Sequence, residues 1–141
     1  MYRIAFFTIL LVSLALTSGP AFSRSLYSEE LVELSGTLQT LMVRAEQTQQ
    51  DDKTGCVAIR RELDELCKKL NRLEDEATTI DLELQRSGNV PNRQLLLSAS
   101  VSKALDLAAS LLGYFLETHD EIFWSSAISA AKSARTMLTA Q

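Results

Sequence analysis

Two cysteines and a single histidine are the residues of this 141-residue chain best suited to redox, metal or nucleophilic chemistry. An even number of cysteines suggests a disulfide if the chain is exported to an oxidising compartment. Cys56 and Cys67 are 11 positions apart, which is about 16 Å along one helix, whereas the Cα atoms of a disulfide lie within about 7 Å. An internal bond therefore requires the helix to unwind near Cys56. Bonds between chains and two free thiols are the alternatives.

His119 is the one histidine, and with Met42 it could supply two axial ligands to a haem iron. That role needs an imidazole that faces inward. The segment Thr118-His119-Asp120-Glu121 instead has the spacing of a helix capping box, which places the imidazole near solvent. Two Cys and one His at these spacings are also too few for a metal centre. The sequence therefore predicts no metal, haem or other cofactor.

The acidic residues of segment 56–86 could provide a pair of catalytic carboxylates, but basic residues alternate with them. This alternation is typical of a solvated helix face with ion pairs four residues apart, such as Glu65 with Lys69. The chain has no Ser-His-acid signature, no glycine-rich phosphate loop and no Glu/His spacing of a di-iron site. We therefore predict that the protein is not an enzyme.

Aromatic residues are the stronger indication of a functional surface, because four of them fall within an 11-residue window: Tyr114, Phe115, Phe123 and Trp124. They could close the end of a core, or some could face outward. Adjacent residues diverge by about 100° on a helix, so Phe123 and Trp124 should divide between core and interface. Exposed Trp and Tyr are common anchors of protein contacts. We predict that these four aromatics bind a partner, with Glu117, His119 and Asp120 as a polar rim.

Four helices should position these residues, at about 28–49, 56–86, 93–117 and 119–140. The second has the clearest pattern, an a/d heptad seam over four heptads: Cys56, Ile59, Leu63, Leu66, Leu70, Leu73, Ala77, Ile80 and Leu84. The first has a shorter seam: Leu31, Leu34, Leu38, Leu41 and Ala45. If the three- and four-residue steps of this seam continued along the chain, they would reach Gly55 and not Cys56, where the second seam begins. This slip favours a turn at 51–55 over one continuous rod.

The third helix is apolar over most of its circumference, which indicates burial on several sides. The fourth is rich in Ala and Ser, whose small side chains let a neighbouring backbone approach closely. Residues 24–86 hold 9 basic and 14 acidic side chains, whereas residues 87–141 hold 4 of each. A charged hairpin should therefore pack over an apolar hairpin. The predicted fold is all-α, an antiparallel four-helix bundle of two helical hairpins.

The first 23 residues have the three parts of a secretory signal peptide: Arg3 in a short basic region, an apolar run from Ile4 to Leu16, and small residues before a cleavage site after Ser23. Removing 23 residues from 141 leaves 118, enough for the single domain 24–141. The mature chain has a net charge of −5, which does not favour binding to nucleic acid. Lys103 and Asp106 interrupt the most apolar mature segment, so we predict that the mature form does not span a membrane.

These observations predict a small exported helical protein, periplasmic or secreted, that acts by binding another protein. Periplasmic inhibitors, immunity-type proteins, chaperones and secretion accessories belong to this class. The alternative is a structural component in which the seam of 56–86 forms a coiled coil between chains, as in a homodimer. A cofactor-binding bundle is the third hypothesis.

Overall fold

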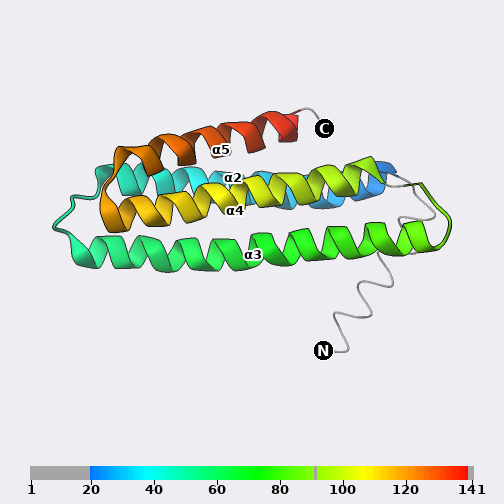
Figure 1. The fold of residues 1–141 in the computed structure, drawn as a ribbon, viewed down its shortest axis with the longest axis horizontal. Helices are drawn as coiled ribbons and strands as arrows, with labels where there is room; N and C mark the ends of the chain where they lie inside the picture. The colour runs from blue at the N-terminus through cyan, green and yellow to red at the C-terminus, as the bar shows by residue number, and fades with distance from the viewer. Residues whose placement is uncertain (1–19, 91, 140–141) are drawn as a thin grey trace.

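The computed structural model describes residues 20–90 and 92–139, and within them the chain is all-α. Figure 1 shows four helices running back and forth along one long axis: α2 (Pro20–Gln47), α3 (Lys53–Arg86), α4 (Arg93–Thr118) and α5 (Glu121–Thr139). They pack against one another around a core of apolar side chains. The all-α prediction is confirmed.

Helix α2 begins earlier than the sequence predicted, at Pro20 and not at Ser28. A proline suits a helix start, because its fixed φ is helical and the N–H that it lacks has no acceptor in the first turn. The predicted signal peptide falls mostly on residues 1–19, which lie outside the described residues. The predicted cleavage site after Ser23 lies within α2.

Helix α3 ends at Arg86 as predicted, but it begins at Lys53, three residues before the predicted start at Cys56 and inside the predicted turn at 51–55. The side chain of Asp52 accepts a hydrogen bond from the Gly55 N–H at 2.9 Å, so this residue caps the start. At the other end, Gly88 adopts φ 87 and the Asn89 N–H donates to the Leu84 carbonyl at 3.0 Å. This left-handed ending is the one that glycine allows without strain.

The predicted seam of α3 is buried at every position: Cys56, Ile59, Leu63, Leu66, Leu70, Leu73, Ala77, Ile80 and Leu84. The predicted seam of α2 is buried too: Leu31, Leu34, Leu38, Leu41 and Ala45. Near the middle of α3, Leu70 has no exposed surface. The heptad pattern therefore identified the inward faces of both helices correctly.

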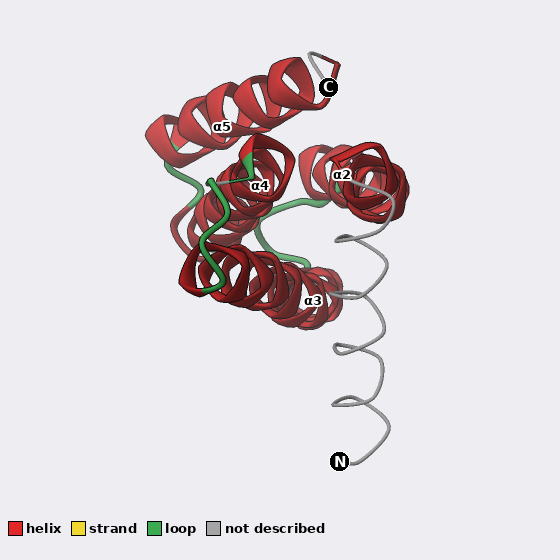
Figure 2. Cartoon of the chain, turned by 90° about the vertical axis from the view of Figure 1, so that its right-hand side faces the viewer, coloured by secondary structure: helices red, strands yellow, loops and turns green. Residues whose placement is uncertain are grey.

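Helix α4 lies at the centre of the arrangement and contacts each of the three other helices. Figure 2 shows α3 and α5 on different sides of α4, and within the described residues these two helices do not touch. In a four-helix bundle the second and fourth helices lie on a diagonal, so the lack of contact between α3 and α5 is compatible with the predicted packing of one hairpin over the other. The near-continuous apolar surface of α4 lets this helix accept a neighbour on several sides.

By length and composition, α4 is also the one described helix that could cross a membrane. Its buried seam is continuous with the core and includes two serines: Leu95, Ser98, Ser102, Leu105, Ala109, Leu112 and Leu116.

One buried carboxylate ties α3 to the start of α4. Asp81 is 2% exposed, and its two oxygens accept hydrogen bonds from the Asn92 N–H at 2.7 Å and from Gln85 Nε2 at 2.6 Å. Asn92 in turn caps α4 by accepting from the Gln94 N–H at 3.0 Å. This chain of hydrogen bonds fixes the direction in which the chain enters α4.

The core begins at Tyr27, whose side chain is 2% exposed. Burial, together with the nearby Glu76 and Glu30, raises the pKa of the Tyr27 hydroxyl to about 12. This hydroxyl therefore stays neutral at physiological pH.

Candidate functional site

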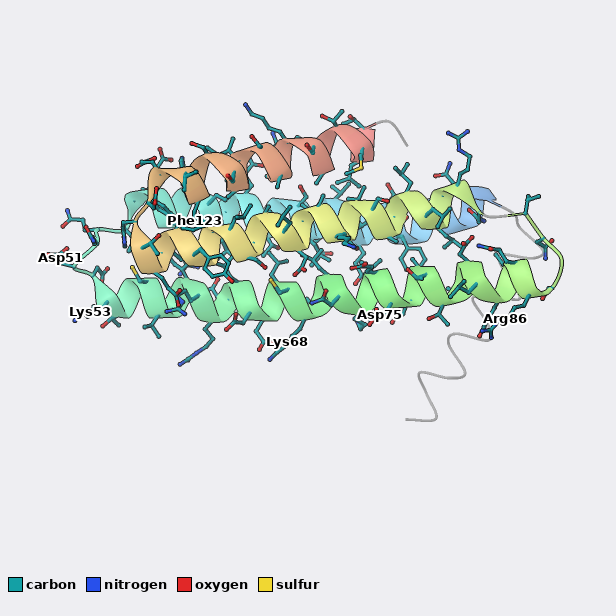
Figure 3. The ribbon with its side chains drawn as sticks, viewed as in Figure 1. Asp51, Lys53, Lys68, Asp75, Arg86 and Phe123 are labelled. Carbon is teal, nitrogen blue, oxygen red and sulfur yellow. The ribbon has the colours of Figure 1, made fainter. Side chains whose placement is uncertain are left out.

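The aromatic residues gather where α4 turns into α5, at the end of the molecule that also holds the α2–α3 turn (Figure 3). His119 makes the turn with a left-handed backbone, φ 55, and its N–H donates to the Phe115 carbonyl at 2.6 Å. Asp120 caps the start of α5, because its side chain accepts a hydrogen bond from the Ile122 N–H at 3.0 Å. The predicted capping box is wrong: Thr118 ends α4, and its hydroxyl donates to the Tyr114 carbonyl at 2.9 Å.

The four aromatics form two pairs, and each pair joins one residue of α4 to one residue of α5. Tyr114 and Phe123 have ring centroids 5.6 Å apart, and Phe115 and Trp124 have centroids 5.2 Å apart. Offset or tilted contacts at such distances are favourable for aromatic rings. The divergence expected of adjacent aromatics is therefore present, and it separates the rings into two sets.

The two pairs differ in their surroundings. The inner pair, Phe115 and Trp124, packs against the hydrophobic core. In the outer pair, the Tyr114 side chain is 53% exposed and Phe123 is half-buried, and the neighbouring Ile122 is 64% exposed. We call Tyr114, Ile122 and Phe123 the outer aromatic surface. It places three large side chains, two of them well exposed, at one corner of the molecule.

A groove of about 210 Å³ between α3 and α4 adjoins this surface. Tyr114 forms part of its wall, together with Arg60, Cys67, Ser110 and Glu117. Arg60 and Glu117 form an ion pair at the Tyr114 end of the groove. The groove is therefore polar and carries both signs of charge.

A second groove, of about 200 Å³, lies between α2 and α5, and we call it the α2/α5 groove. Its apolar lining includes Met42 and Val43 from α2 and Trp124 and Ile128 from α5. Trp124 thus belongs both to the inner aromatic pair and to this groove. Sequence analysis missed both grooves, because the lateral packing of helices has no local sequence signal.

Both cysteines are free thiols. Helix α3 is unbroken from Cys56 to Cys67, so the unwinding that an internal disulfide requires is not present. Cys56 is buried. Burial, with a hydrogen bond to Asp106, raises the pKa of the Cys67 thiol to about 12. Since the thiolate is the reactive form, Cys67 is a poor nucleophile in this setting.

The His119 ring stacks on Phe115, with centroids 5.4 Å apart. Its ring nitrogens are buried and have no hydrogen-bond partner among the described residues. The expectation of an imidazole near solvent is therefore wrong. Met42, the second residue of the haem hypothesis, lines the α2/α5 groove. In the described part of the chain, no three His, Cys, Asp or Glu side chains are placed to hold a metal ion.

The charged face of α3 forms ion pairs between helices as well as within one. Arg44 of α2 pairs with Glu62 at 2.7 Å, and Arg72 pairs with Glu30 of α2 at 2.7 Å. Within α3, Glu65 pairs with Lys68 at 3.0 Å.

The predicted partner of Glu65 was Lys69, so this ion pair spans three residues and not four. The predicted four-residue spacing is present between Arg72 and Glu76, at 3.5 Å. Figure 3 shows Lys68 on the outer side of α3. Exposed pairs of this kind contribute about 0–1 kcal/mol each.

Comparison of the chain with protein-family models, with curated proteins and with solved structures found no match.

Proposed function

We propose that the protein is exported and folds, after loss of residues 1–23, as a four-helix bundle that binds another protein. The outer aromatic surface carries the proposal. The exposed Tyr114 and the half-buried Phe123 pack ring against ring across the α4–α5 turn, and the exposed Ile122 directly precedes Phe123 on α5. Aromatic side chains in such positions supply much of the binding energy at protein interfaces.

The arrangement favours binding over catalysis. The one histidine stacks on a core aromatic ring, and the raised pKa of Cys67 keeps its thiol protonated. By contrast, Tyr114 and Ile122 of the outer aromatic surface are more than half exposed. We propose no cofactor, no nucleic-acid ligand and no membrane-spanning mature form.

The alternative, a coiled coil between chains, would need the heptad seam of α3 on the outside. In the packed helices that seam is buried from Cys56 to Leu84. A rod would therefore require α3 to leave its contacts with α2 and α4. The bundle that binds through its surface is the more economical proposal.

Replacing Tyr114 and Phe123 with alanine should strongly weaken partner binding and leave the fold intact. The loss should amount to about 2–4 kcal/mol, as at other interface hot spots, or roughly 30- to 800-fold in Kd. The partner is first captured with the purified protein from the extracytoplasmic fraction of the source cells, and its affinity is then measured by calorimetry.

Leu107→Ala is the matched control, because Leu107 is 54% exposed one heptad before Tyr114 on α4. Both variants should keep the helical circular dichroism and melting temperature of the parent. Unchanged affinity in the Tyr114/Phe123 variant, or an equal loss with Leu107→Ala, would remove the outer aromatic surface from the proposal.

Export is expected to produce a mature chain that starts at Arg24, since Ala21 and Ser23 are small residues at the positions that signal peptidase reads. N-terminal sequencing of the protein recovered from outside the cytoplasm checks this. Recovery of chains that still begin at Met1 would contradict it.

A further inference from the structure

The α2/α5 groove combines an apolar floor with a basic edge. Lys132 and Arg135 line its α5 side, and Glu46 and Gln39 line its α2 side. Within the described residues, neither Lys132 nor Arg135 takes part in an ion pair. The chain as a whole carries a net charge of −4, so this basic edge stands out on an acidic protein.

The open form of the groove follows from the packing of α5. Helix α5 makes most of its contacts with α4, and its buried residues are the small Ala127 and Ala134. Figure 2 shows α5 above α4 and α2 beside α4, and among the helix pairs in contact α2 and α5 share the smallest contact. Val43 of α2 is consequently 48% exposed inside the groove.

The dimensions of the groove suit a helix better than a small ligand. Its volume of about 200 Å³ is below the range of about 300–1,000 Å³ typical of small-molecule pockets. Its lining runs along α5 from Trp124 to Arg135, which is about 16 Å, or three helical turns. A long, shallow channel between two helices accepts the side chains of one apolar helix stripe.

We propose that the α2/α5 groove binds an amphipathic helix of the partner protein whose apolar stripe is bordered by acidic residues on one edge. The stripe packs on Met42, Val43 and Ile128. The acidic edge faces Lys132 and Arg135 of α5, because on the α2 side Glu46 would repel it. This inference rests on the proposed protein-binding function and names the kind of segment that is bound.

A peptide titration tests the proposal without knowledge of the natural partner. Trp124 is the single tryptophan of the chain and lines the groove, so its fluorescence reports occupancy. The probes are two synthetic amphipathic helices of about 18 residues, long enough to be helical, with the same leucine stripe and with either Glu or Lys along one edge. The Glu peptide should shift Trp124 emission to shorter wavelength and bind about tenfold or more tightly than the Lys peptide, with an affinity that falls as salt increases.

Matched variants locate the binding. Val43→Glu should weaken the Glu peptide by about tenfold or more, since it places a charge against the leucine stripe. Val32→Glu, at a 57% exposed position of the same helix outside the groove, should not. The Lys132→Glu/Arg135→Glu variant should reverse the preference between the peptides. The Arg93→Glu/Lys103→Glu variant, with the same charge change on α4, should leave that preference in place.

Equal binding of both peptides, or equal losses with Val32→Glu and Val43→Glu, would overturn the proposal. So would dimerisation in sedimentation experiments that Val43→Glu abolishes, since the occupant would then be a second copy. A shift of Trp124 emission with laurate but with neither peptide would identify an amphiphile as the occupant and equally overturn it.

If the captured partner is lost with the Tyr114/Phe123 variant but retained by Val43→Glu, and neither peptide changes the Trp124 emission, the protein-binding function stands and the groove assignment fails. If no protein is captured, the function fails, and the titration still decides what the groove accepts.

Discussion

Leu70→Ala is expected to lower the free energy of unfolding by about 2–5 kcal/mol, the range observed when a fully buried leucine leaves a cavity behind. Leu70 has no exposed surface, and it lies near the middle of the α3 seam. Neighbours near the centre of a helix cannot easily collapse into the space, so the loss should be toward the upper part of this range. Urea unfolding followed by circular dichroism measures the change.

Leu82→Ala is the control for Leu70→Ala, because Leu82 is on the same helix and is 49% exposed. It should cost less than about 1 kcal/mol. A loss below about 0.5 kcal/mol for Leu70→Ala at low protein concentration would contradict the packing described above. That outcome would favour the alternative in which the α3 seam forms a coiled coil between chains.

Asp81→Ala is expected to destabilise the protein by about 3 kcal/mol, although it removes only a short side chain. The carboxylate is buried, and its loss deprives both the Asn92 N–H and Gln85 Nε2 of an acceptor. Hydrogen bonds to charged groups contribute about 1.5–3 kcal/mol. Of the two donors, the N–H of the half-buried Asn92 is less easily reached by water than the side chain of the exposed Gln85. Thermal and urea unfolding of the variant measure the effect.

Two further variants separate this role from a general effect of charge. Asp75→Ala, at an exposed position of the same helix, should change stability by no more than about 0.5 kcal/mol. Asp81→Asn keeps one acceptor oxygen and should fall between the two. If Asp81→Ala and Asp75→Ala are equivalent, the hydrogen bonds of Asp81 do not hold the α3–α4 connection.

The sequence predicted the inward faces of α2 and α3 because burial along a helix follows a local period. Leu31 to Ala45 and Cys56 to Leu84 repeat at three- and four-residue steps, and no knowledge of the neighbours is needed to recognise that repeat. The end of α3 was equally predictable from the sequence, since Ser87-Gly88 is a strong signal for the end of a helix. The role of Asp81 was not, because its backbone partner at Asn92 lies across a loop.

The candidate site was predictable in composition but not in arrangement. The clustering of the four aromatics is a property of the sequence, and so is the divergence of Phe123 from Trp124. Whether Phe123 or Trp124 meets the core depends on where α5 begins. That start depends on a choice between Thr118 and Asp120 as the cap, and both residues can accept a hydrogen bond from the backbone. The left-handed backbone of His119 settled the choice in favour of Asp120.

The central place of α4 has a consequence for the order in which the protein can form. The chain emerges from its N-terminus, so α2 and α3 are available before the helix that both of them contact. Until residues 93–118 have followed, the apolar faces of the first two helices have only each other to cover them. A stable partial fold is therefore not expected, and the chain should remain unfolded until α4 has been made. If the protein is exported as an unfolded chain, such a delay keeps it in the unfolded state in which it can cross the membrane.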